Sequence, residues 1–403
     1  MKILIVSQYF WPENFRINDL VEGLVDRGHT VAVLTGQPTY NIQSGDLADQ
    51  NLSDFKGTPV MRVPMFGRGQ GKLGLLLNYL SFFLSASTIG LWKLRGRQFN
   101  VMFAPQLSPV TAILPAILIR GLWQRKLAIW VLDLWPDTLE ALGVVRSPRM
   151  LGWVGAMVRF IYHRSDCIFV QSKSFVKKVS TQSRQPVDIE YLPGWAEVMA
   201  DPDDADYAPE VTQLPDVFTV LFAGNIGATQ DFPSVVKAMT LLRDQPGLRW
   251  IIVGDGRMAD WLRNECLTRS LANVELVGAY SIDRMPSFFK HADALLVPLK
   301  SEPIFAMTIP GKVQTYLASG KPILAMLDGE GANVVNEAGA GMVCGAGNGE
   351  GLADSVLKMM ALTPDARMAM GRAGKTYCER SFNRDTLIDQ VEQRLQRLAD
   401  VTP

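Results

Sequence analysis

The sequence predicts an α/β protein of two Rossmann-like domains, each a parallel sheet flanked by helices, with a cleft between the domains. The chain has 403 residues, 48% of them hydrophobic, which is too long for one core and suits two domains of ordinary size. Short apolar runs alternate with helical stretches along nearly its whole length, as in doubly wound sheets. An acidic stretch with several prolines, Asp201 to Pro215, interrupts this alternation, and we interpret it as the connection between the domains.

The first predicted domain covers residues 1–200 and opens with a strand, a helix and a parallel strand. The helix is expected at 17–27 and ends at Gly28. Strands of this domain are predicted at 3–7, 30–35, 60–63, 101–104, 127–132, 167–171 and 189–192. The second predicted domain, 216–375, repeats the pattern, with strands at 219–223, 249–253, 274–277, 294–299 and 322–325. The tail, 376–403, is predicted to pack as a helix across both domains.

Charge and cysteine content limit the classes of function. The net charge is zero, but residues 1–193 hold about 21 Lys and Arg against about 13 Asp and Glu, and the remainder is acidic. The basic half favours an anionic membrane surface or an acidic substrate, whereas nucleic acid is disfavoured because no arginine-rich run occurs. Four scattered cysteines without CxxC spacing argue against a zinc site and against a disulfide framework. With an N-terminal apolar run too short for a signal peptide, we expect a protein of the cytoplasm.

One apolar stretch, Leu73 to Leu94, is nearly long enough to span a bilayer. Asn78, three serines and Thr88 dilute it, and basic residues flank both of its ends. It is compatible with a buried helix of a large domain, with a helix lying in the membrane interface, or with a true span. A second apolar stretch, 112–122, is followed by Trp123, Arg125 and Lys126 and favours the interfacial alternative.

Residues 294–325 carry the strongest signal for a binding site. A buried-type strand leads into a polar loop, and Pro310 and Gly311 then open a helix whose first turn contains Lys312. Unpaired backbone N–H groups, the positive end of the helix dipole and an ammonium group would all point at one place. The pattern predicts a phosphate-binding helix start, although Lys312 has the plain alternative of a solvated helix-start lysine.

Glycine-rich turns follow three strands of the second predicted domain. They are Gly224-Asn225-Ile226-Gly227, Gly254-Asp255-Gly256 and Gly278-Ala279-Tyr280. Taken singly, each is a weak motif that a plain tight turn also explains. Because the carboxyl ends of parallel strands meet at one sheet edge, three such turns together predict a nucleotide-binding crevice.

Further short motifs extend this pattern over nearly the whole chain. They are Trp11-Pro12-Glu13, Arg27-Gly28-His29, Asp133-Leu134-Trp135-Pro136, Leu192-Pro193-Gly194-Trp195 and Gly320-Lys321-Pro322. With them the chain resembles the GT-B-fold, family-4 glycosyltransferases, and among these the bacterial N-acetyl-L-fucosamine transferases of O-antigen assembly. The resemblance implies retaining, metal-independent transfer from a nucleotide sugar held by the second domain to an acceptor held by the first. It implies no cofactor, because the nucleotide sugar is a substrate, and we expect a UDP-sugar rather than a GDP-sugar.

The loops and the resemblance together give the candidate site residues. The catalytic candidates are Asp133, Glu302, Lys312 and Arg16, and the acceptor-binding candidates are Trp135 and Pro136. The donor-binding candidates are Asn14, Phe15, Gly224, Asn225, Gly227, Gly254, Asp255, Gly256, Gly278, Tyr280, Pro303, Ile304, Phe305, Gly311, Gln314 and Thr315.

The chain departs from the family's pattern at several of these positions. Typical members carry a Glu-x7-Glu pair whose positions fall here on Met307 and Thr315, so Glu302 is a candidate for the first role and Gln314 or Thr315 for the ribose. The family's basic pair after the first strand of the second domain is Asn225 and Gln230 here. Lys312 and Arg16 are the candidate replacements, each able to stabilise a leaving phosphate.

Asp133 is the candidate that orients or deprotonates the acceptor hydroxyl, because it follows a predicted strand directly. An aspartate that caps a helix or stabilises a turn is the structural alternative, as a plain loop carboxylate is for Glu302. His29 is expected to be structural. Asp201-Pro202-Asp203 matches a metal-binding Asp-x-Asp pattern but lies in the predicted linker, which argues against a metal there.

The sequence therefore favours a transferase that adds a sugar to a lipid-linked acceptor at the cytoplasmic face of the inner membrane, peripherally attached, in O-antigen or related lipopolysaccharide synthesis. Two alternatives stay open. One is a nucleotide-sugar epimerase of the same fold, which would need no membrane-facing apolar surface. The other is a non-catalytic nucleotide-sugar-binding protein, suggested by the missing glutamate pair.

Overall fold

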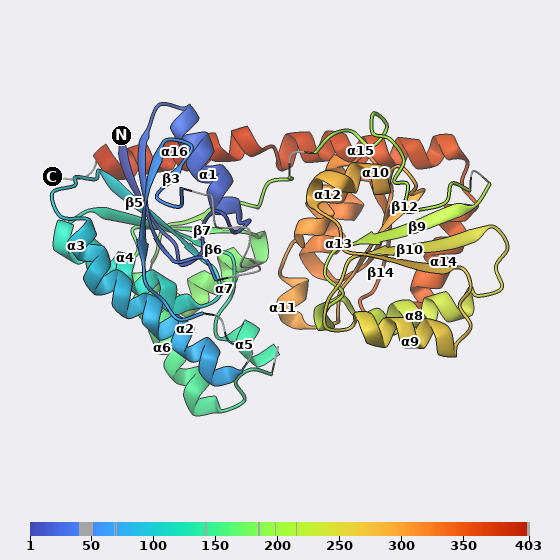
Figure 1. Ribbon diagram of the computed structural model, residues 1–403, viewed down its shortest axis with the longest axis horizontal. Helices are drawn as coiled ribbons and strands as arrows, with labels where there is room; N and C mark the ends of the chain where they lie inside the picture. Colours follow the sequence, from blue (N-terminus) through green and yellow to red (C-terminus); the bar gives the residue numbers. More distant parts are fainter. Residues whose placement is uncertain are drawn as a thin grey trace. The chain divides into compact units, whose positions relative to one another are not determined.

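The computed structural model describes residues 1–39, 51–67, 69, 71–141, 143–183, 186–197, 199–214 and 216–400. The chain forms two compact units. The first comprises Met1–Pro193 and Asp385–Pro403, and the second comprises Gly194–Arg384. Each unit is an α/β sandwich built around one sheet (Figure 1).

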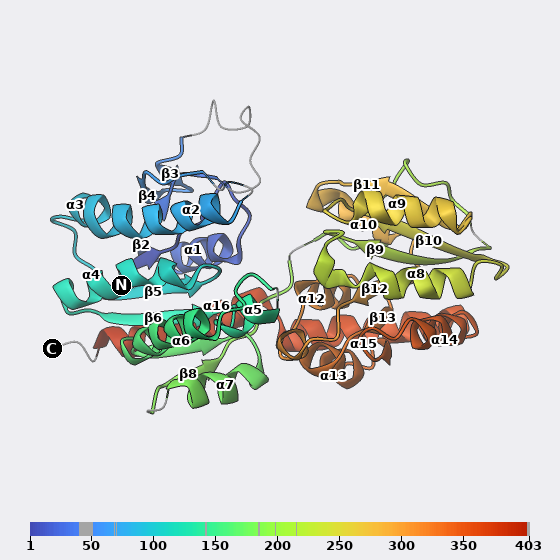
Figure 2. The same ribbon diagram turned by 90° about the horizontal axis from the view of Figure 1, so that it is seen from below.

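The sheet of the first unit has eight strands in the order β3-β4-β2-β1-β5-β6-β7-β8, which can be followed in Figure 2. All neighbours pair in parallel except the short β3, which pairs antiparallel with β4 at the edge. The strands are β1 (Lys2–Val6), β2 (Thr30–Gly36), β3 (Asp54–Phe55), β4 (Thr58–Val63), β5 (Val101–Gln106), β6 (Lys126–Val131), β7 (Cys167–Val170) and β8 (Ile189–Tyr191). The predicted parallel sheet is confirmed, with a hairpin that the sequence analysis did not predict.

Helices cover both faces of this sheet. Helices α1 and α16 lie on one face and α2, α4 and α6 on the other (Figure 1). The helices of this unit are α1 (Arg16–Asp26), α2 (Lys72–Ser85), α3 (Leu91–Lys93), α4 (Leu114–Trp123), α5 (Asp137–Ala141), α6 (Pro148–His163), α7 (Lys173–Ser183) and α16 (Arg384–Asp400), with a π-helical turn at Ala86–Gly90 after α2. Helix α16 packs through its buried residues Ile388, Val391 and Leu395, and it also contacts α1 and the turn after it, where Glu392 lies 2.8 Å from His29 and Asp389 lies 2.6 Å from Arg27.

The second unit has a six-stranded, fully parallel sheet in the order β11-β10-β9-β12-β13-β14. Its strands are β9 (Phe218–Ala223), β10 (Leu248–Val253), β11 (Val274–Gly278), β12 (Ala294–Pro298), β13 (Ile323–Met326) and β14 (Gly341–Cys344). Chain order reverses between β9 and β12, so β9 lies at the switch point where ligands bind in open α/β sheets.

Two apolar cores lie on the two faces of the second sheet. In Figure 1 helices α8 and α9 lie on one face, and α10, α12 and α15 lie on the other. The helices are α8 (Phe232–Leu241), α9 (Ala259–Thr268), α10 (Met285–Phe289), α11 (Pro303–Ala306), α12 (Gly311–Ala318), α13 (Gly329–Glu337), α14 (Gly349–Met360) and α15 (Pro364–Ser381). Strands β9, β10, β12 and β13 are buried along their whole lengths, which explains their continuous apolar sequences.

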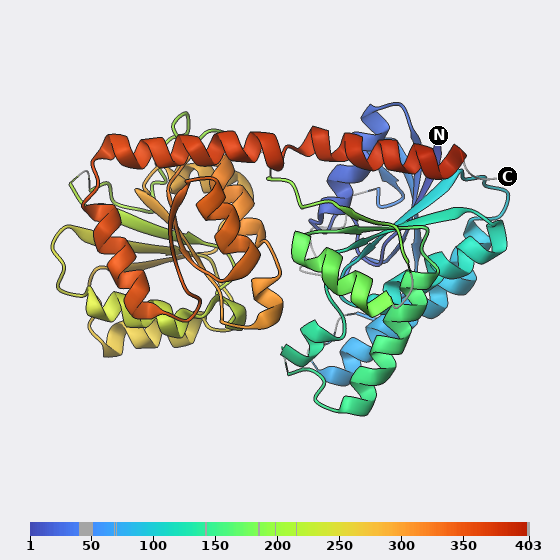
Figure 3. The same ribbon diagram turned by 180° about the vertical axis from the view of Figure 1, so that it is seen from behind.

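The boundaries of the units differ from the predicted ones in two places. The stretch predicted as a linker packs as part of the second unit, where Ala208 and Val211 are buried in its core and Arg284 bonds Glu210 at 2.8 Å. Pro215 lies outside the described residues. The predicted tail helix is two helices, α15 and α16, and Figure 3 shows the interruption between them. Helix α15 ends at Ser381, and Phe382 leaves helical geometry, with φ −131° and ψ 22°, and is buried in the core of the second unit.

Both carboxylates of the Asp201-x-Asp203 pattern lie near lysines. Asp201 bonds Lys375 Nζ at 2.6 Å, and Asp203 lies 3.7 Å from Lys321 Nζ. The Lys375 ammonium lowers the pKa of Asp201 below its ordinary value. The pattern thus serves to attach this segment to the second unit.

The apolar stretch at 73–94 forms α2, the π-helical turn and α3, and lies along the first unit. Its inner side is buried at intervals of four residues, at Asn78, Phe82, Ala86 and Gly90. Asn78 is fully buried and accepts a hydrogen bond from Gln8 Nε2 at 2.9 Å, which ties the helix to the loop after β1. By length and composition the segment Leu73–Lys93 could cross a membrane, but only 22% of its most apolar part is buried in the protein. Its outer side therefore presents leucines to the surroundings.

Candidate active site

Three glycine turns meet at the carboxyl edge of the second sheet, after β9, β10 and β11. Gly224 N–H donates to Val253 O at 2.8 Å, and Gly254 N–H donates to Gly278 O at 2.7 Å. A Cβ atom on Gly254 would lie 1.9 Å from the Gly224 carbonyl oxygen, and Gly254 has a φ of +144° that side chains disfavour. Glycine is therefore required there for the turns to pack against each other. The structure brings the three predicted turns together.

Asn225 fills the space that the neighbouring glycines leave. A Cβ atom on Gly227 would lie 2.6 Å from Asn225 Nδ2, and one on Gly256 would lie 2.5 Å from Asn225 Oδ1. Asp255 is exposed, and its carboxylate accepts the Gly256 N–H at 2.7 Å, so it shapes the turn. Tyr280 packs on Phe288 with ring centroids 4.8 Å apart.

Lys312 extends from the first turn of α12 onto the turn after β9. A Cβ atom on Gly224 would lie 2.6 Å from Lys312 Cε and 2.7 Å from its Nζ, so the ammonium group occupies the space beside this glycine. Lys312 Nζ donates to Gln230 Oε1 at 3.4 Å and lies 4.9 Å from the centroid of the Phe222 ring. Within the described residues it forms no ion pair with a carboxylate. Burial lowers its pKa from 10.5 to about 8.

The predicted convergence of α12 with the first glycine turn is thus present in the structure. A partly buried ammonium without a carboxylate, beside backbone N–H groups and a helix start, is an arrangement that suits a phosphate. The plain alternative, a freely solvated lysine at a helix start, does not describe this environment.

Tyr316, one turn further along α12, is a site residue that the sequence analysis missed. Its hydroxyl accepts the Ala223 N–H at 2.9 Å and donates to the Ala223 carbonyl at 3.2 Å. The side chain is 1% exposed. It fastens α12 to the end of β9, directly before Gly224. The only signal in the sequence is its place four residues after Lys312, which also fits a plain core tyrosine.

We expect Tyr316→Phe to lower the free energy of unfolding by about 1–3 kcal/mol, because both polar groups of Ala223 lose a buried partner. Donor affinity should fall as well, because α12 is no longer tied to the turn. Urea unfolding and donor titration measure the two effects. The control is Tyr377→Phe, whose hydroxyl bonds Glu337 at the surface and whose loss should change stability by less than about 0.5 kcal/mol. Equal effects of the two substitutions would contradict the proposed link.

Glu302 precedes the short helix α11. Its backbone carbonyl accepts hydrogen bonds from Phe305 N and Ala306 N, at 3.0 and 3.1 Å, while no hydrogen bond of its carboxylate is found among the described residues. Ile304 is 4% exposed, so its side chain belongs to the core and only its backbone is open to a ligand. Pro303 is exposed, Phe305 is partly buried, and the Glu302 carboxylate remains open to a sugar hydroxyl.

The structure argues against Gln314 as the ribose-binding residue. Gln314 is 2% exposed, and its Nε2 donates to the Gly194 carbonyl at 2.6 Å, so it is occupied inside the second unit. The sequence could not show this, because the partner lies 120 residues away in the chain. Thr315 is partly exposed and lies three residues after Lys312, on the same side of the helix. Of the two ribose candidates, Thr315 is the one that the structure leaves accessible.

Arg257 is a second residue that the sequence analysis missed. It follows Gly256 at the same sheet edge, is exposed, and forms no ion pair within the described part of the chain. A signal was present, because an arginine directly after a glycine turn is placed to meet an anion at that turn.

In the first unit, the loop after β1 is rigidly held. Glu13 is 4% exposed and accepts hydrogen bonds from Phe10 N and Thr39 N, while Arg62 donates to the carbonyls of Gly36 and Trp11. Burial lowers the pKa of Arg62 to about 10. This scaffold supports the predicted residues Asn14, Phe15 and Arg16: Asn14 is exposed, Phe15 stacks on Tyr9 with centroids 5.5 Å apart, and Arg16 begins α1.

Asp133 lies in the turn that follows β6, at the carboxyl edge of the first sheet. Gln106 Nε2 donates to its backbone carbonyl at 3.1 Å. Burial raises the pKa of the Asp133 carboxyl to about 6, and the Thr138 hydroxyl offsets only part of that rise. The carboxylate makes no capping hydrogen bond to a backbone N–H in the described residues. This arrangement favours a proton-transfer group over the capping alternative.

Trp135 and Pro136 were predicted to contact the acceptor. Trp135 is 6% exposed, and its indole N–H is buried without a hydrogen-bond partner in the structure. Its carbonyl accepts a hydrogen bond from Gln182 Nε2 at 3.4 Å, and the bond to Pro136 is cis. Pro136 is partly exposed, so of the two residues only Pro136 offers an accessible side chain.

Comparisons with known proteins agree with this geometry. Residues 14–195 match the family described as glycosyl transferase 4-like domain, and residues 217–361 match glycosyl transferases group 1. A putative colanic acid biosynthesis glycosyl transferase of Escherichia coli (strain K12), WcaI, is 26% identical over 337 residues, which cover 79% of this chain and 82% of that protein.

Solved structures show the same fold. Sucrose-phosphate synthase from Thermosynechococcus elongatus has a TM-score of 0.71 at 14% identity, with 98% of each chain covered. Anabaena HepE in complex with UDP-glucose has a TM-score of 0.66 at 14% identity, covering 98% of this chain and 100% of that one. The fold is therefore GT-B. With one glycosyltransferase domain matched in each half, the chain is a GT-B glycosyltransferase.

Proposed function

We propose that this glycosyltransferase moves a sugar from a nucleotide diphosphate sugar, a UDP-sugar in preference to a GDP-sugar, onto a lipid-linked acceptor. Transfer proceeds with retention and without a metal. It serves bacterial surface polysaccharide synthesis, with O-antigen as the product and N-acetyl-L-fucosamine as the sugar suggested by sequence resemblance. The observation that carries the proposal is the Lys312 ammonium, held without a carboxylate partner against Gly224.

The second unit supplies the groups for the donor. In the reaction, the bond between the anomeric carbon and the diphosphate oxygen breaks, and the diphosphate gains negative charge. Lys312 and the N–H groups at the start of α12 stabilise that charge, and Glu302 accepts hydrogen bonds from the sugar hydroxyls. Thr315 contacts the ribose.

The first unit supplies the groups for the acceptor. Asp133, with a pKa of about 6, is mostly ionised at neutral pH and accepts the proton of the attacking hydroxyl as the new glycosidic bond forms. Pro136 borders the acceptor. Arg16, which lies at the N-terminal end of α1, contributes positive charge toward the donor phosphates.

The names of similar proteins support the donor and the pathway. HepE is described with bound UDP-glucose, which supports a UDP-sugar for this chain. WcaI is named for colanic acid biosynthesis, and WaaG, of similar fold at a TM-score of 0.67, for lipopolysaccharide biosynthesis. Both names fit the assembly of a bacterial surface glycan.

The outer surface of α2 supports peripheral attachment to the inner face of the cytoplasmic membrane. Leu73, Leu76, Leu80 and Leu84 recur at helical spacing and are 42–70% exposed. A soluble monomer rarely exposes such a contiguous apolar stripe. An interfacial helix would bury it at the boundary between lipid headgroups and acyl chains.

Thermal unfolding of the purified protein with a panel of UDP-, GDP- and dTDP-sugars tests the donor. A true donor binds only the folded state and raises the unfolding midpoint, and the best donor is then assayed for transfer to a lipid-linked acceptor. We expect a UDP-sugar to give the largest rise. A panel in which no nucleotide sugar raises the midpoint would refute the proposed donor.

Assays of acceptor-free turnover and of sedimentation with liposomes, added to the thermal shift, separate the two alternatives. An epimerase would convert the free nucleotide sugar without an acceptor and would not sediment with anionic liposomes. A non-catalytic protein would show the thermal shift without transfer or hydrolysis.

A further inference from the structure

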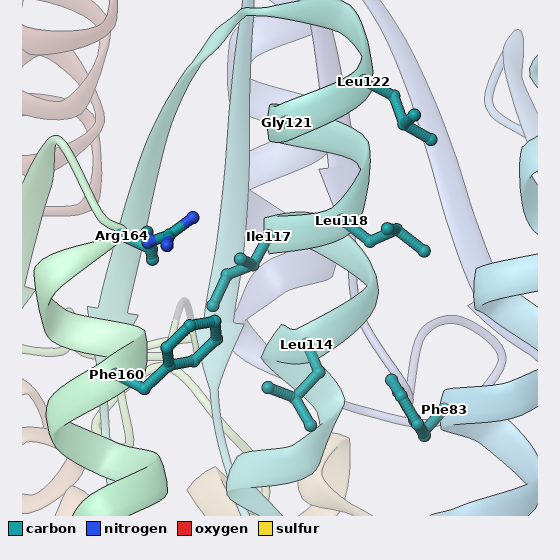
Figure 4. A pocket seen from close by; sticks show the side chains of 8 residues that line it. All are labelled: Phe83, Leu114, Ile117, Leu118, Gly121, Leu122, Phe160 and Arg164. Carbon is teal, nitrogen blue, oxygen red and sulfur yellow. The ribbon is translucent and has the colours of Figure 1, made fainter.

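An apolar groove opens on the face of the first unit formed by α2, α4 and α6. Six apolar side chains line it, together with Arg164 from the end of α6 (Figure 4). They are Phe83, Leu114, Ile117, Leu118, Leu122 and Phe160. The groove encloses about 400 Å³, which falls in the size range of small-ligand sites. No residue of the candidate active site lies in it.

The groove continues into an apolar surface. Leu118 and Leu122 of α4 are 41% and 61% exposed, and Trp153 of α6 is 82% exposed. Along α6, Met150, Trp153, Met157 and Phe160 recur at helical spacing, and the stripe ends at Arg164. The groove is thus a recess within a larger apolar surface, and exposing such a surface to water is unfavourable.

Positive charge collects at one end of this surface. The loops before the parallel strands β5, β6 and β7 lie at the amino edge of the sheet, and these loops and the last residue of α3 together hold Lys93, Arg95, Arg97, Arg125 and Arg164. Within the described residues none of these five forms an ion pair. The one acid in these loops, Asp166, is already bonded to Arg120 and Lys126 at 2.8 and 3.1 Å.

Arg164 joins the charged edge to the groove. It follows the last turn of α6, is exposed, and its guanidinium carbon lies 5.2 Å from the centroid of the Phe160 ring, one of the groove walls. Trp92 and Trp123 lie on α3 and at the end of α4, next in sequence to the cationic loops, and tryptophan is enriched at membrane interfaces. This face of the first unit thus combines an apolar recess, which suits an acyl chain, with exposed cations, which suit an anionic headgroup.

We propose that this groove binds one acyl chain of an anionic membrane phospholipid, with the lipid phosphate at Arg164. The proposal rests on the membrane attachment proposed above and adds a specific lipid site to it. Burial of the acyl chain in the groove removes apolar surface of both the lipid and the protein from water. The Arg164 guanidinium donates hydrogen bonds to the phosphate oxygens.

Position in the fold selects a bilayer lipid rather than the lipid carrier of the acceptor. Helix α6 has 16 residues, about 24 Å of length, and Arg164 follows its C-terminal end. Its N-terminal end lies on the side of the carboxyl edge of the sheet, where Asp133 lies in the turn after β6. An acceptor phosphate held at Arg164 would therefore lie about one helix length from the proposed base. A second copy of this chain is disfavoured, because the two cationic edges would repel.

The test uses the full chain and dioctanoyl phosphatidylglycerol below its micelle concentration, with dioctanoyl phosphatidylcholine for comparison, measured by calorimetry. Gly121→Trp fills the groove, and a Cβ atom at Gly121 meets no atom within 4 Å, so a side chain can be attached at this position without a clash at the backbone. We expect this variant to bind phosphatidylglycerol at least about tenfold more weakly. Arg164→Gln should weaken it about fivefold and remove the preference over phosphatidylcholine.

The matched control is Arg149→Gln, which removes an exposed arginine from the opposite end of the same helix and should leave the affinity unchanged. If Arg149→Gln lost as much affinity for phosphatidylglycerol as Arg164→Gln, binding would be due to general charge attraction and the proposal would be wrong. If Gly121→Trp bound the lipid as tightly as the wild type, the groove would not be the binding site. A dimer of the wild type in sedimentation equilibrium that Gly121→Trp dissociates would assign the groove to a second copy. The thermal shift with donor sugars should be the same in all variants, so a missing shift would refute the proposed donor without touching the lipid site.

Discussion

Lys312→Ala should lower the rate of sugar transfer by about 10²- to 10³-fold without unfolding the protein. The ammonium lies against Gly224 and forms no ion pair in the described part of the chain, so its removal leaves no carboxylate there without a partner. Steady-state transfer kinetics and the thermal unfolding midpoint measure the two effects. The matched control is Lys358→Ala, an exposed lysine on α14, which should change neither.

The pH dependence checks the same assignment. Only the protonated amine attracts a diphosphate, so kcat/KM of the wild type should fall as the pH rises through about 8, the pKa of Lys312. Since the folded pKa is below the ordinary value of 10.5, the unfolded chain binds more protons between pH 8 and 10.5, and stability should rise with pH in that window. Both effects should disappear in Lys312→Ala. If Lys312→Ala retained a transfer rate near that of the wild type, Lys312 would have no part in the active site.

Asp133→Asn should abolish transfer while leaving the donor-induced thermal shift intact. The base is lost, whereas Lys312, Glu302 and Thr315, which are proposed to bind the donor, lie in the second unit and are unchanged. Because burial raises the pKa of Asp133 to about 6, the folded state binds an extra proton between pH 4 and 6, and stability falls as the pH rises through that window. At pH 7 the buried carboxylate therefore costs stability, and the neutral amide should raise the unfolding midpoint. Wild-type kcat/KM should decline below about pH 6, where the base becomes protonated.

Asp137→Asn is the matched control for Asp133. Its carboxylate bonds Lys178 at 2.6 Å and Gln182 at 3.1 Å, so its replacement should lower stability instead of raising it. A capping or turn-forming role for Asp133 predicts that Asp133→Asn also loses stability and keeps its activity. That pair of results would show Asp133 to be structural.

The strand pattern and the glycine turns were predictable because they depend on local constraints. Strands such as β9 and β12 are buried on both faces and therefore read as continuous apolar runs. Gly224 and Gly254 adopt φ angles that favour glycine and stand at strand ends. The topology rule for parallel sheets then places these turns at one edge, where the structure has them.

Other features depended on partners distant in the sequence. The sequence makes Gln314 a candidate for the ribose, but in the structure its side chain is hydrogen-bonded to Gly194. Tyr316 fastens α12 to β9 only through its hydrogen bonds with Ala223. The tail was predicted as one helix because its apolar residues recur near helical spacing, whereas in the structure Phe382 leaves helical geometry and packs in the core of the second unit. Helix propensity alone does not report such tertiary contacts.

By itself, the sequence determined the two parallel-sheet units, the glycine turns and the lysine at the start of α12, since each follows from local backbone chemistry and burial periodicity. The tertiary structure decided which polar side chains are free to act. It placed the Lys312 ammonium beside Gly224 and buried Asp133 enough to raise its pKa. It also gave Gln314 a hydrogen-bond partner in Gly194, and it exposed the leucines of α2 while Asn78 is buried. The physical reason is that burial and hydrogen-bond satisfaction are properties of contacts between distant segments, which one-dimensional spacing does not contain.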